Sequence, residues 1–312
     1  MPLLAQRVIN QQLRSLGMLL QAASEAVDDP APSTAARADL DHVNSHPDKE
    51  NLLGLRWWAH RGAALNVHAA VEHLKGVRSI LAGDELLPLP AMTLARSVYE
   101  AVINTCWLID VEVSTEQRIA RWAGRLLNDT QEIPNALDSF GGKDAARKER
   151  ERTVEGRGMG QRLLTRAGFE LLAKGGDRAE ETARVTYQSE KSSLTPVMTD
   201  AVKRFTPDQQ SLWKVFSGAT HSQGWLVSGL EGPIEELYAS ILTPLLDTGD
   251  ALAVEVGRYF GINPREPVTR LHRHRTVLLR RARPSDSAVH GVDGFRAASG
   301  LWPLPPRDNL PL

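Results

Sequence analysis

The sequence predicts an all-α fold, a multi-helix bundle in which most neighbouring helices run antiparallel. Apolar residues recur at helical spacing over long stretches, and capping residues and prolines mark where helices begin. No convincing alternation of apolar and polar residues occurs, and no strand-turn-strand signal such as Asn-Gly is present. We therefore expect roughly six to nine helices around one core.

The first half of the chain contains four predicted segments. Arg7–Val27 is amphipathic and is followed by a polar linker that extends to about Glu50. Leu52–Leu81 is predicted as one long helix, closed by Gly83. Pro90–Val111 is apolar nearly all round, which predicts a buried helix.

The next segments are defined by their ends. Ser114 and Gln117 form a capping box that starts a helix running to about Leu137. A charged helix over Lys143–Glu155 then precedes a mobile glycine-rich joint at Gly156–Gly160. A short helix is predicted over Gln161–Lys174.

Proline positions organise the last third of the chain. Thr195-Pro196 and Thr206-Pro207 place a capping hydroxyl before a proline at the first helical position. Pro233 opens a helix to Phe260, with Gly261 at its C-terminal cap. A basic helix follows, and a disordered tail is expected from Pro284 onward. These features divide the chain into an N-terminal helix and linker (1–50), a helical core domain (51–262), and a basic helix with a flexible tail (263–312).

Composition excludes several classes of protein. The 37 Lys and Arg residues nearly balance the 38 Asp and Glu residues, so the chain is not a bulk polycation. The single cysteine, Cys106, excludes an internal disulfide and a multi-cysteine zinc site. The N-terminus lacks the pattern of a secretory signal, and Arg96 and Glu100 interrupt the one long stretch with few charges. We expect a cytoplasmic protein that does not contact a membrane.

Arg96 and Glu100 are the first candidate site residues. They lie four residues apart on one face of the buried helix, where an unpaired charge is costly. Asn104 extends this polar strip, and Trp107 flanks it. Two interpretations stay open: an ion pair that only fixes helix register, or the wall of a polar pocket.

A second polar strip combines Ser217, His221 and Trp225 at four-residue spacing. It lies opposite the apolar side of its helix, so it faces either water or a cleft. His221 could act as a general acid or base with Ser217 nearby, but no carboxylate partner is dictated by the sequence. A hydrogen-bonded structural histidine is the alternative.

One further histidine and two arginines are candidate binding residues. His60 falls within the apolar arc of its helix and is a candidate ligand contact, whereas no metal-ligand motif and no cofactor motif is found. Arg118 and Arg121 share one helix side with Arg125 and could hold a phosphate or carboxylate. The alternative is a solvated face with local ion pairs to Glu116 or Asp129.

The segment Arg265–Arg283 contains seven arginines and one glutamate. This local excess of positive charge predicts contact with a nucleic acid or an acidic partner, or else a solvated helix folded on an acidic body.

Several short motifs resemble a known group of proteins. The segments Ala95–Ala101, Cys106–Asp110, Arg118–Arg121 and Ser217–His221, with Trp225, resemble uncharacterised helical proteins common in GC-rich actinobacteria. In that group an Arg-x-x-x-Glu helix precedes a Ser-x-x-x-His helix, which implies a joint site in an all-helical fold. A remote likeness is to HEPN helical bundles, many of which cut RNA. Their hallmark arginine and histidine lie farther apart on one helix than Arg56 and His60 do here.

Two functional hypotheses follow. The first is a binding protein that holds a small polar or anionic ligand, or a partner, in a polar pocket between helices. The second is a hydrolase or RNase-like enzyme that uses His221 as general acid or base, with Glu100 and Ser217 beside it. A homodimer is compatible with either hypothesis.

Overall fold

The computed structural model describes residues 2–83, 87–138, 144–176, 181–221 and 234–263. The basic segment Arg265–Arg283, the expected tail and Trp225 lie outside the described residues. The helices and strands, in chain order, are α1 (Pro2–Ala26), α2 (Ala35–Ser45), α3 (Lys49–Ala82), α4 (Pro88–Leu108), α5 (Thr115–Asp138), α6 (Asp144–Arg166), β1 (Phe169–Ala173), β2 (Thr182–Tyr187), β3 (Glu190–Ser193), α7 (Met198–Phe205), the short 3₁₀ helix η2 (Pro207–Gln209), α8 (Gln210–Thr220) and α10 (Ile234–Phe260).

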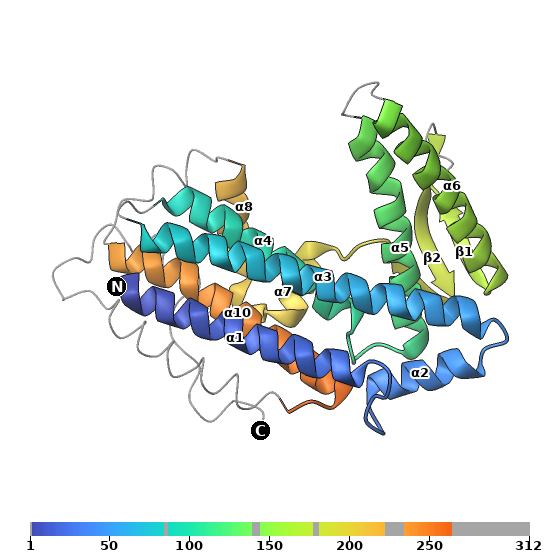
Figure 1. The fold of residues 1–312 in the computed structure, drawn as a ribbon, viewed down its shortest axis with the longest axis horizontal. Coiled ribbons are helices and arrows are strands. Elements are labelled where there is room, and N and C mark those ends of the chain that lie inside the picture. The colour runs from blue at the N-terminus through green and yellow to red at the C-terminus, as the bar shows by residue number, and fades with distance from the viewer. Residues whose placement is uncertain (1, 84–86, 139–143, 177–180, 222–233, 264–312) are drawn as a thin grey trace.

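Four long helices, α1, α3, α4 and α10, lie side by side and form the main bundle (Figure 1). At one end of the bundle, α5, α6 and the three strands form an arm that projects away from the long helices (Figure 1). The helix α8 lies against α4, near the other end of the bundle (Figure 1). The predicted helical fold class is therefore confirmed.

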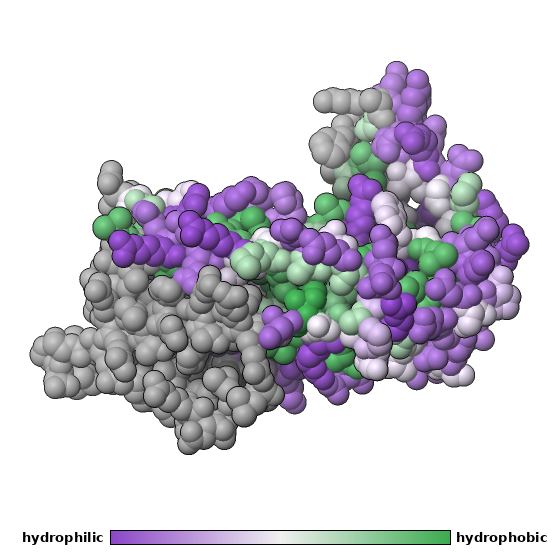
Figure 2. Space-filling view, turned by 60° about the horizontal axis from the view of Figure 1, so that its bottom comes forward, coloured by the Kyte–Doolittle hydropathy of each residue, from purple (hydrophilic) through white to green (hydrophobic). Residues whose placement is uncertain are grey.

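One hydrophobic core runs through the bundle and into the arm. It includes the buried side chains Leu16 of α1, Leu74 of α3, Tyr99 of α4 and Tyr259 of α10. α4 is buried on most of its surface, as its composition predicts. Hydrophilic residues cover much of the face shown in Figure 2, with hydrophobic residues gathered near its middle.

Several predicted helix ends are confirmed. Gly83 caps α3, and Gly261, with φ of +77°, follows α10 in the left-handed conformation that glycine adopts most easily. The Ser114 hydroxyl accepts a hydrogen bond of 3.0 Å from the backbone N–H of Gln117. Among the described residues the reciprocal bond of the capping box, from the Ser114 N–H to the Gln117 side chain, is not formed, and the Gln117 amide nitrogen donates to the carbonyl of Lys191 at 2.9 Å.

Two predictions are wrong: the polar linker before Glu50 and the mobile joint at Gly156–Gly160. The polar segment before Glu50 contains α2, whose start is capped by the Thr34 hydroxyl at 3.2 Å from the N–H of Arg37. The glycines at 156–160 lie inside α6, which continues without a break to Arg166. Packing of α6 against α5 outweighs the modest helix penalty of these glycines.

The three-stranded antiparallel sheet, in the order β1-β2-β3, was not predicted. The segment expected as a helix over Gln161–Lys174 instead ends α6 at Arg166 and continues as β1. The turn between β2 and β3 uses Gln188 and Ser189, both with positive φ. These residue types seldom adopt that conformation, so the turn carries no recognisable sequence signal.

Candidate functional site

Arg96 and Glu100 form an ion pair along α4. The Nε atom of Arg96 donates to Oε1 of Glu100 at 2.9 Å. The side chain of Arg96 is 18% exposed and that of Glu100 is 39% exposed. The pair therefore lies at the edge of the bundle, with the guanidinium mostly covered and the carboxylate partly in solvent.

α8 brings aromatic and imidazole groups to the same guanidinium. The Arg96 guanidinium lies over the Trp213 ring, 5.0 Å from its centroid. Nη1 of Arg96 is 3.4 Å from Nε2 of His221, the residue that caps the C-terminal end of α8. Because an arginine nitrogen only donates, this contact requires Nε2 of His221 to accept and the ring proton to lie on Nδ1.

The alignment of α8 on α4 follows from helical spacing. Trp213, Ser217 and His221 recur every four residues, so they form one stripe along α8. The neighbouring Phe216 is buried and makes an edge contact with Tyr99 of α4, at 6.4 Å between ring centroids. This apolar contact holds the two helices together and places the ends of the stripe against Arg96. We name Arg96, Glu100, Trp213, Ser217 and His221 the α4–α8 cluster.

The structure thus brings Arg96, Glu100 and His221 together, with Arg96 between the other two. Asn104 does not extend the cluster through its amide nitrogen, which donates to the backbone carbonyl of Glu100 at 2.8 Å. Trp213 was not among the predicted site residues, although its position one helical turn before Ser217 places it on the same stripe. Trp225, the third residue of the predicted strip, lies outside the described residues.

Arg118 is buried, so the prediction that it lies on a solvated face is wrong. Its guanidinium is buried and bonds both carboxylate oxygens of Asp39, on α2. Asp39 lies 79 residues earlier in the chain, so local spacing could not reveal the pair. Arg118 is therefore occupied by the protein's own carboxylate and has no free face for a ligand.

Arg121 is also engaged internally. Its Nη1 atom donates to the backbone carbonyl of Trp107 at 2.7 Å and to Oδ2 of Asp110 at 3.0 Å. Its guanidinium lies 5.2 Å from the Trp107 ring centroid. Burial lowers the pKa of Arg121, and the hydrogen bond to Asp110 opposes that shift. Trp107 and Arg121 thus belong to the packing of α4 on α5 and not to the α4–α8 cluster. Arg125, by contrast, pairs with Asp129 at 3.0 Å, as the local-pair alternative predicts.

His60 is part of a buried hydrogen-bond chain. Its Nε2 atom lies 3.1 Å from the Tyr259 hydroxyl, which donates to Oδ2 of Asp39 at 2.9 Å. Burial, helped by the charge of Arg56, lowers the pKa of His60 to about 3. His60 is therefore a neutral core histidine, and its ligand role has no support in this geometry.

Among the described residues, no three His, Cys, Asp or Glu side chains converge as metal ligands. Within the same part of the chain, no helix has the length and apolar character needed to cross a bilayer.

Comparison with protein-family models, with curated proteins and with solved structures found no match to this chain. The resemblance to actinobacterial helical proteins and the remote HEPN likeness therefore stay expectations.

Proposed function

We propose that the protein binds a small polar ligand carrying an anionic group, and that the α4–α8 cluster holds that group. The observation that carries this proposal is the position of the Arg96 guanidinium, which meets Glu100, Trp213 and His221 at the edge of the bundle. Glu100 bonds only the Nε atom of this guanidinium and is partly in solvent, so the terminal nitrogens can still bind a carboxylate or phosphate.

The hydrogen-bonding capacity of the cluster supports the proposal. Within the described part of the chain, Nη2 of Arg96 and Nδ1 of His221 have no hydrogen-bond partner. The Arg96–His221 contact of 3.4 Å is long for a hydrogen bond, so an anion that accepts from both groups can replace it at little cost. Ser217 lies one helical turn before His221 on α8 and is half-buried.

The enzyme alternative is less well supported by the same geometry. General base catalysis by His221 is usually aided by a carboxylate that orients the imidazole. Among the described residues, the group that contacts the imidazole is the Arg96 guanidinium, and Glu100 bonds a different nitrogen of that guanidinium. This arrangement favours binding of an anion over activation of a nucleophile.

A ligand screen tests the proposal directly. We expect at least one of inorganic phosphate, citrate, AMP and acetyl-coenzyme A to raise the melting temperature of the full chain, because a ligand that binds only the folded state stabilises it. Arg96→Gln and His221→Gln should each remove the shift. Arg61→Gln is the matched control, because Arg61 is exposed and also lies over a tryptophan, Trp57, at 5.2 Å.

Two outcomes would overturn the proposal: no shift with any of the four anions, or an undiminished shift in Arg96→Gln. Turnover of RNA or of an ester that disappears in His221→Gln but persists in Arg61→Gln would replace it with the enzyme alternative.

A further inference from the structure

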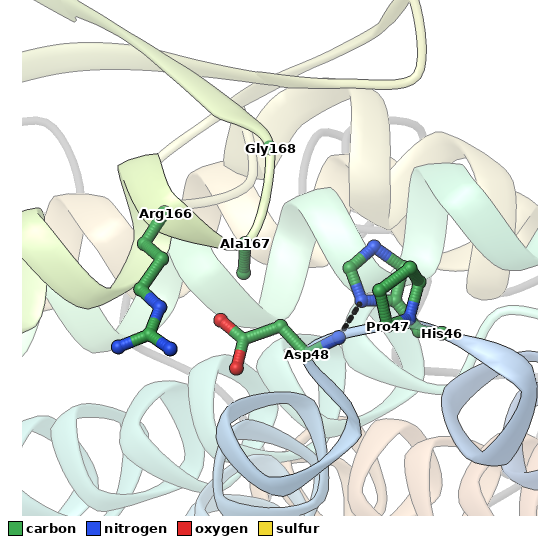
Figure 3. Close-up of a pocket in the computed structure, with 6 residues that line it drawn as sticks. All are labelled: His46, Pro47, Asp48, Arg166, Ala167 and Gly168. Carbon is green, nitrogen blue, oxygen red and sulfur yellow. Dashed lines mark hydrogen bonds between the residues drawn. The ribbon is translucent and has the colours of Figure 1, made fainter.

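A pocket of about 360 Å³, open to solvent and called the cavity below, lies between the turn that joins α2 to α3 and the turn that joins α6 to β1. It is lined by His46, Pro47, Asp48, Arg166, Ala167 and Gly168 (Figure 3). This cavity is near the N-terminal end of α3, whereas α8 lies toward the other end of that helix (Figure 1). It is therefore separate from the α4–α8 cluster.

Two opposite charges face each other across the cavity without pairing. The guanidinium of Arg166, the last residue of α6, and the carboxylate of Asp48, just before α3, point toward one another (Figure 3). No salt bridge joins them, and Arg166 has no hydrogen-bond partner within the described ranges. Each carboxylate oxygen of Asp48 accepts from the Asn51 amide, at 2.9 and 2.8 Å. Asn51 thus holds the carboxylate in place.

His46 contributes a donor on the wall beside Asp48. Its Nδ1 atom accepts a hydrogen bond of 3.0 Å from the backbone N–H of Asp48 (Figure 3). The neutral ring therefore carries its proton on Nε2, which is left as a donor. The exposed Pro47 ring adds apolar surface beside these polar groups, and Ala167 is buried beneath the pocket.

We propose that this cavity binds a small zwitterion of the α-amino-acid type, with its carboxylate on Arg166 and its ammonium group on Asp48. A simple anion would gain the guanidinium but would also approach the Asp48 carboxylate, and a simple cation would meet the reverse conflict. A molecule that carries both charges can pair with the Arg166 guanidinium and the Asp48 carboxylate at the same time. The apolar surface of Pro47 suits a small aliphatic side chain, and the volume is within the usual range for small-ligand sites.

Isothermal titration calorimetry on the full chain tests this proposal with glycine, L-alanine and L-leucine as probes. L-leucinamide, which lacks the carboxylate, and N-acetyl-L-leucine, which lacks the ammonium group, are the matched analogues. We expect L-leucine to bind and each analogue to bind at least about tenfold more weakly. Equal binding of either analogue, or no heat with any of the three amino acids, would overturn the proposal. Preferential binding of inorganic phosphate would identify a plain anion site instead.

Variants test whether Arg166 and Asp48 each contribute to L-leucine binding. Arg166→Gln and Asp48→Asn should each weaken L-leucine binding by about tenfold or more. Arg162→Gln on α6 and Glu50→Gln on α3 are exposed controls on the same two helices and should bind normally. Circular dichroism would show that each variant is folded. Changes in the NMR chemical shifts of the His46 ring protons on addition of L-leucine provide a second measure of binding at this cavity. Arg96→Gln should leave L-leucine binding unchanged, which separates this proposal from the function proposed for the α4–α8 cluster.

Discussion

The guanidinium of Arg118 holds the carboxylate of Asp39 through three hydrogen bonds of 2.6 to 3.1 Å. The side chains are 3% and 0% exposed, respectively. Two carbonyl oxygens, of Asp110 and Val113, accept from the other terminal nitrogen of Arg118. This pair therefore ties α2 to α5 and to the loop after α4, inside the protein.

Asp39→Asn should strongly destabilise the fold, by about 3 to 5 kcal/mol, because it removes the carboxylate that bonds the buried Arg118 guanidinium directly. Urea denaturation followed by circular dichroism measures the loss. Arg147→Gln, which breaks an exposed pair with Asp144 on α6, is the control and should change the unfolding free energy very little. An equally small effect of Asp39→Asn would show that the buried pair is not needed for stability.

The buried imidazole of His60 should make stability depend on pH. Its pKa is about 3 in the folded protein, below the ordinary histidine value of 6.5. Between these values the unfolded chain binds a proton that the folded chain does not, so the free energy of unfolding falls as pH falls through this window. The slope from this one residue reaches about 1.4 kcal/mol per pH unit.

The measurement is the unfolding free energy at several pH values between the two pKa values, in the wild type and in His60→Gln. The glutamine variant should show the shallower dependence. His68→Gln, an exposed position on the same helix, should keep the wild-type slope. Parallel curves for the wild type and His60→Gln would contradict the prediction.

Gly124 allows α5 to approach β3 closely. A Cβ atom at this position would lie 2.7 Å from the carbonyl oxygen of Ser193. Gly124→Ala should therefore cost about 1 to 3 kcal/mol of stability, because backbone must shift to relieve the overlap. Gly54→Ala on α3 meets no atom within 4 Å and should stabilise the protein by up to about 1 kcal/mol. Thermal unfolding of the two variants should shift in opposite directions, and a shift in the same direction would refute this account.

The arginine-rich segment Arg265–Arg283 stays a predicted nucleic-acid or acidic-partner contact. If it binds RNA or DNA, affinity should fall steeply as salt rises, because phosphate contacts release counterions. Removal of residues 265–312 should abolish the binding. Fluorescence anisotropy with labelled RNA and DNA at several salt concentrations measures both effects. Unchanged retention by the shortened chain would eliminate the idea.

Local sequence determined the features that depend on residues a few positions apart. The Arg96–Glu100 pair follows from four-residue spacing on a helix, and the burial of α4 follows from its apolar surface. The stripe of Ser217 and His221 was visible for the same reason. Its meeting with Arg96 was only suspected, because 125 residues separate Arg96 from His221.

Tertiary packing decided the rest. Sequence marked α4 and α5 as helices because helical periodicity and caps are local properties, but it could not show that Arg118 meets Asp39 or that Arg121 meets Asp110. The short sheet was not predicted because its turn residues, Gln188 and Ser189, have positive φ, a conformation that these residue types rarely adopt. Asp48 and Arg166 come to face each other only when distant turns are brought together. The ion-pair partner of a charged side chain depends on which element packs against it. That packing is set by the three-dimensional arrangement of the whole core.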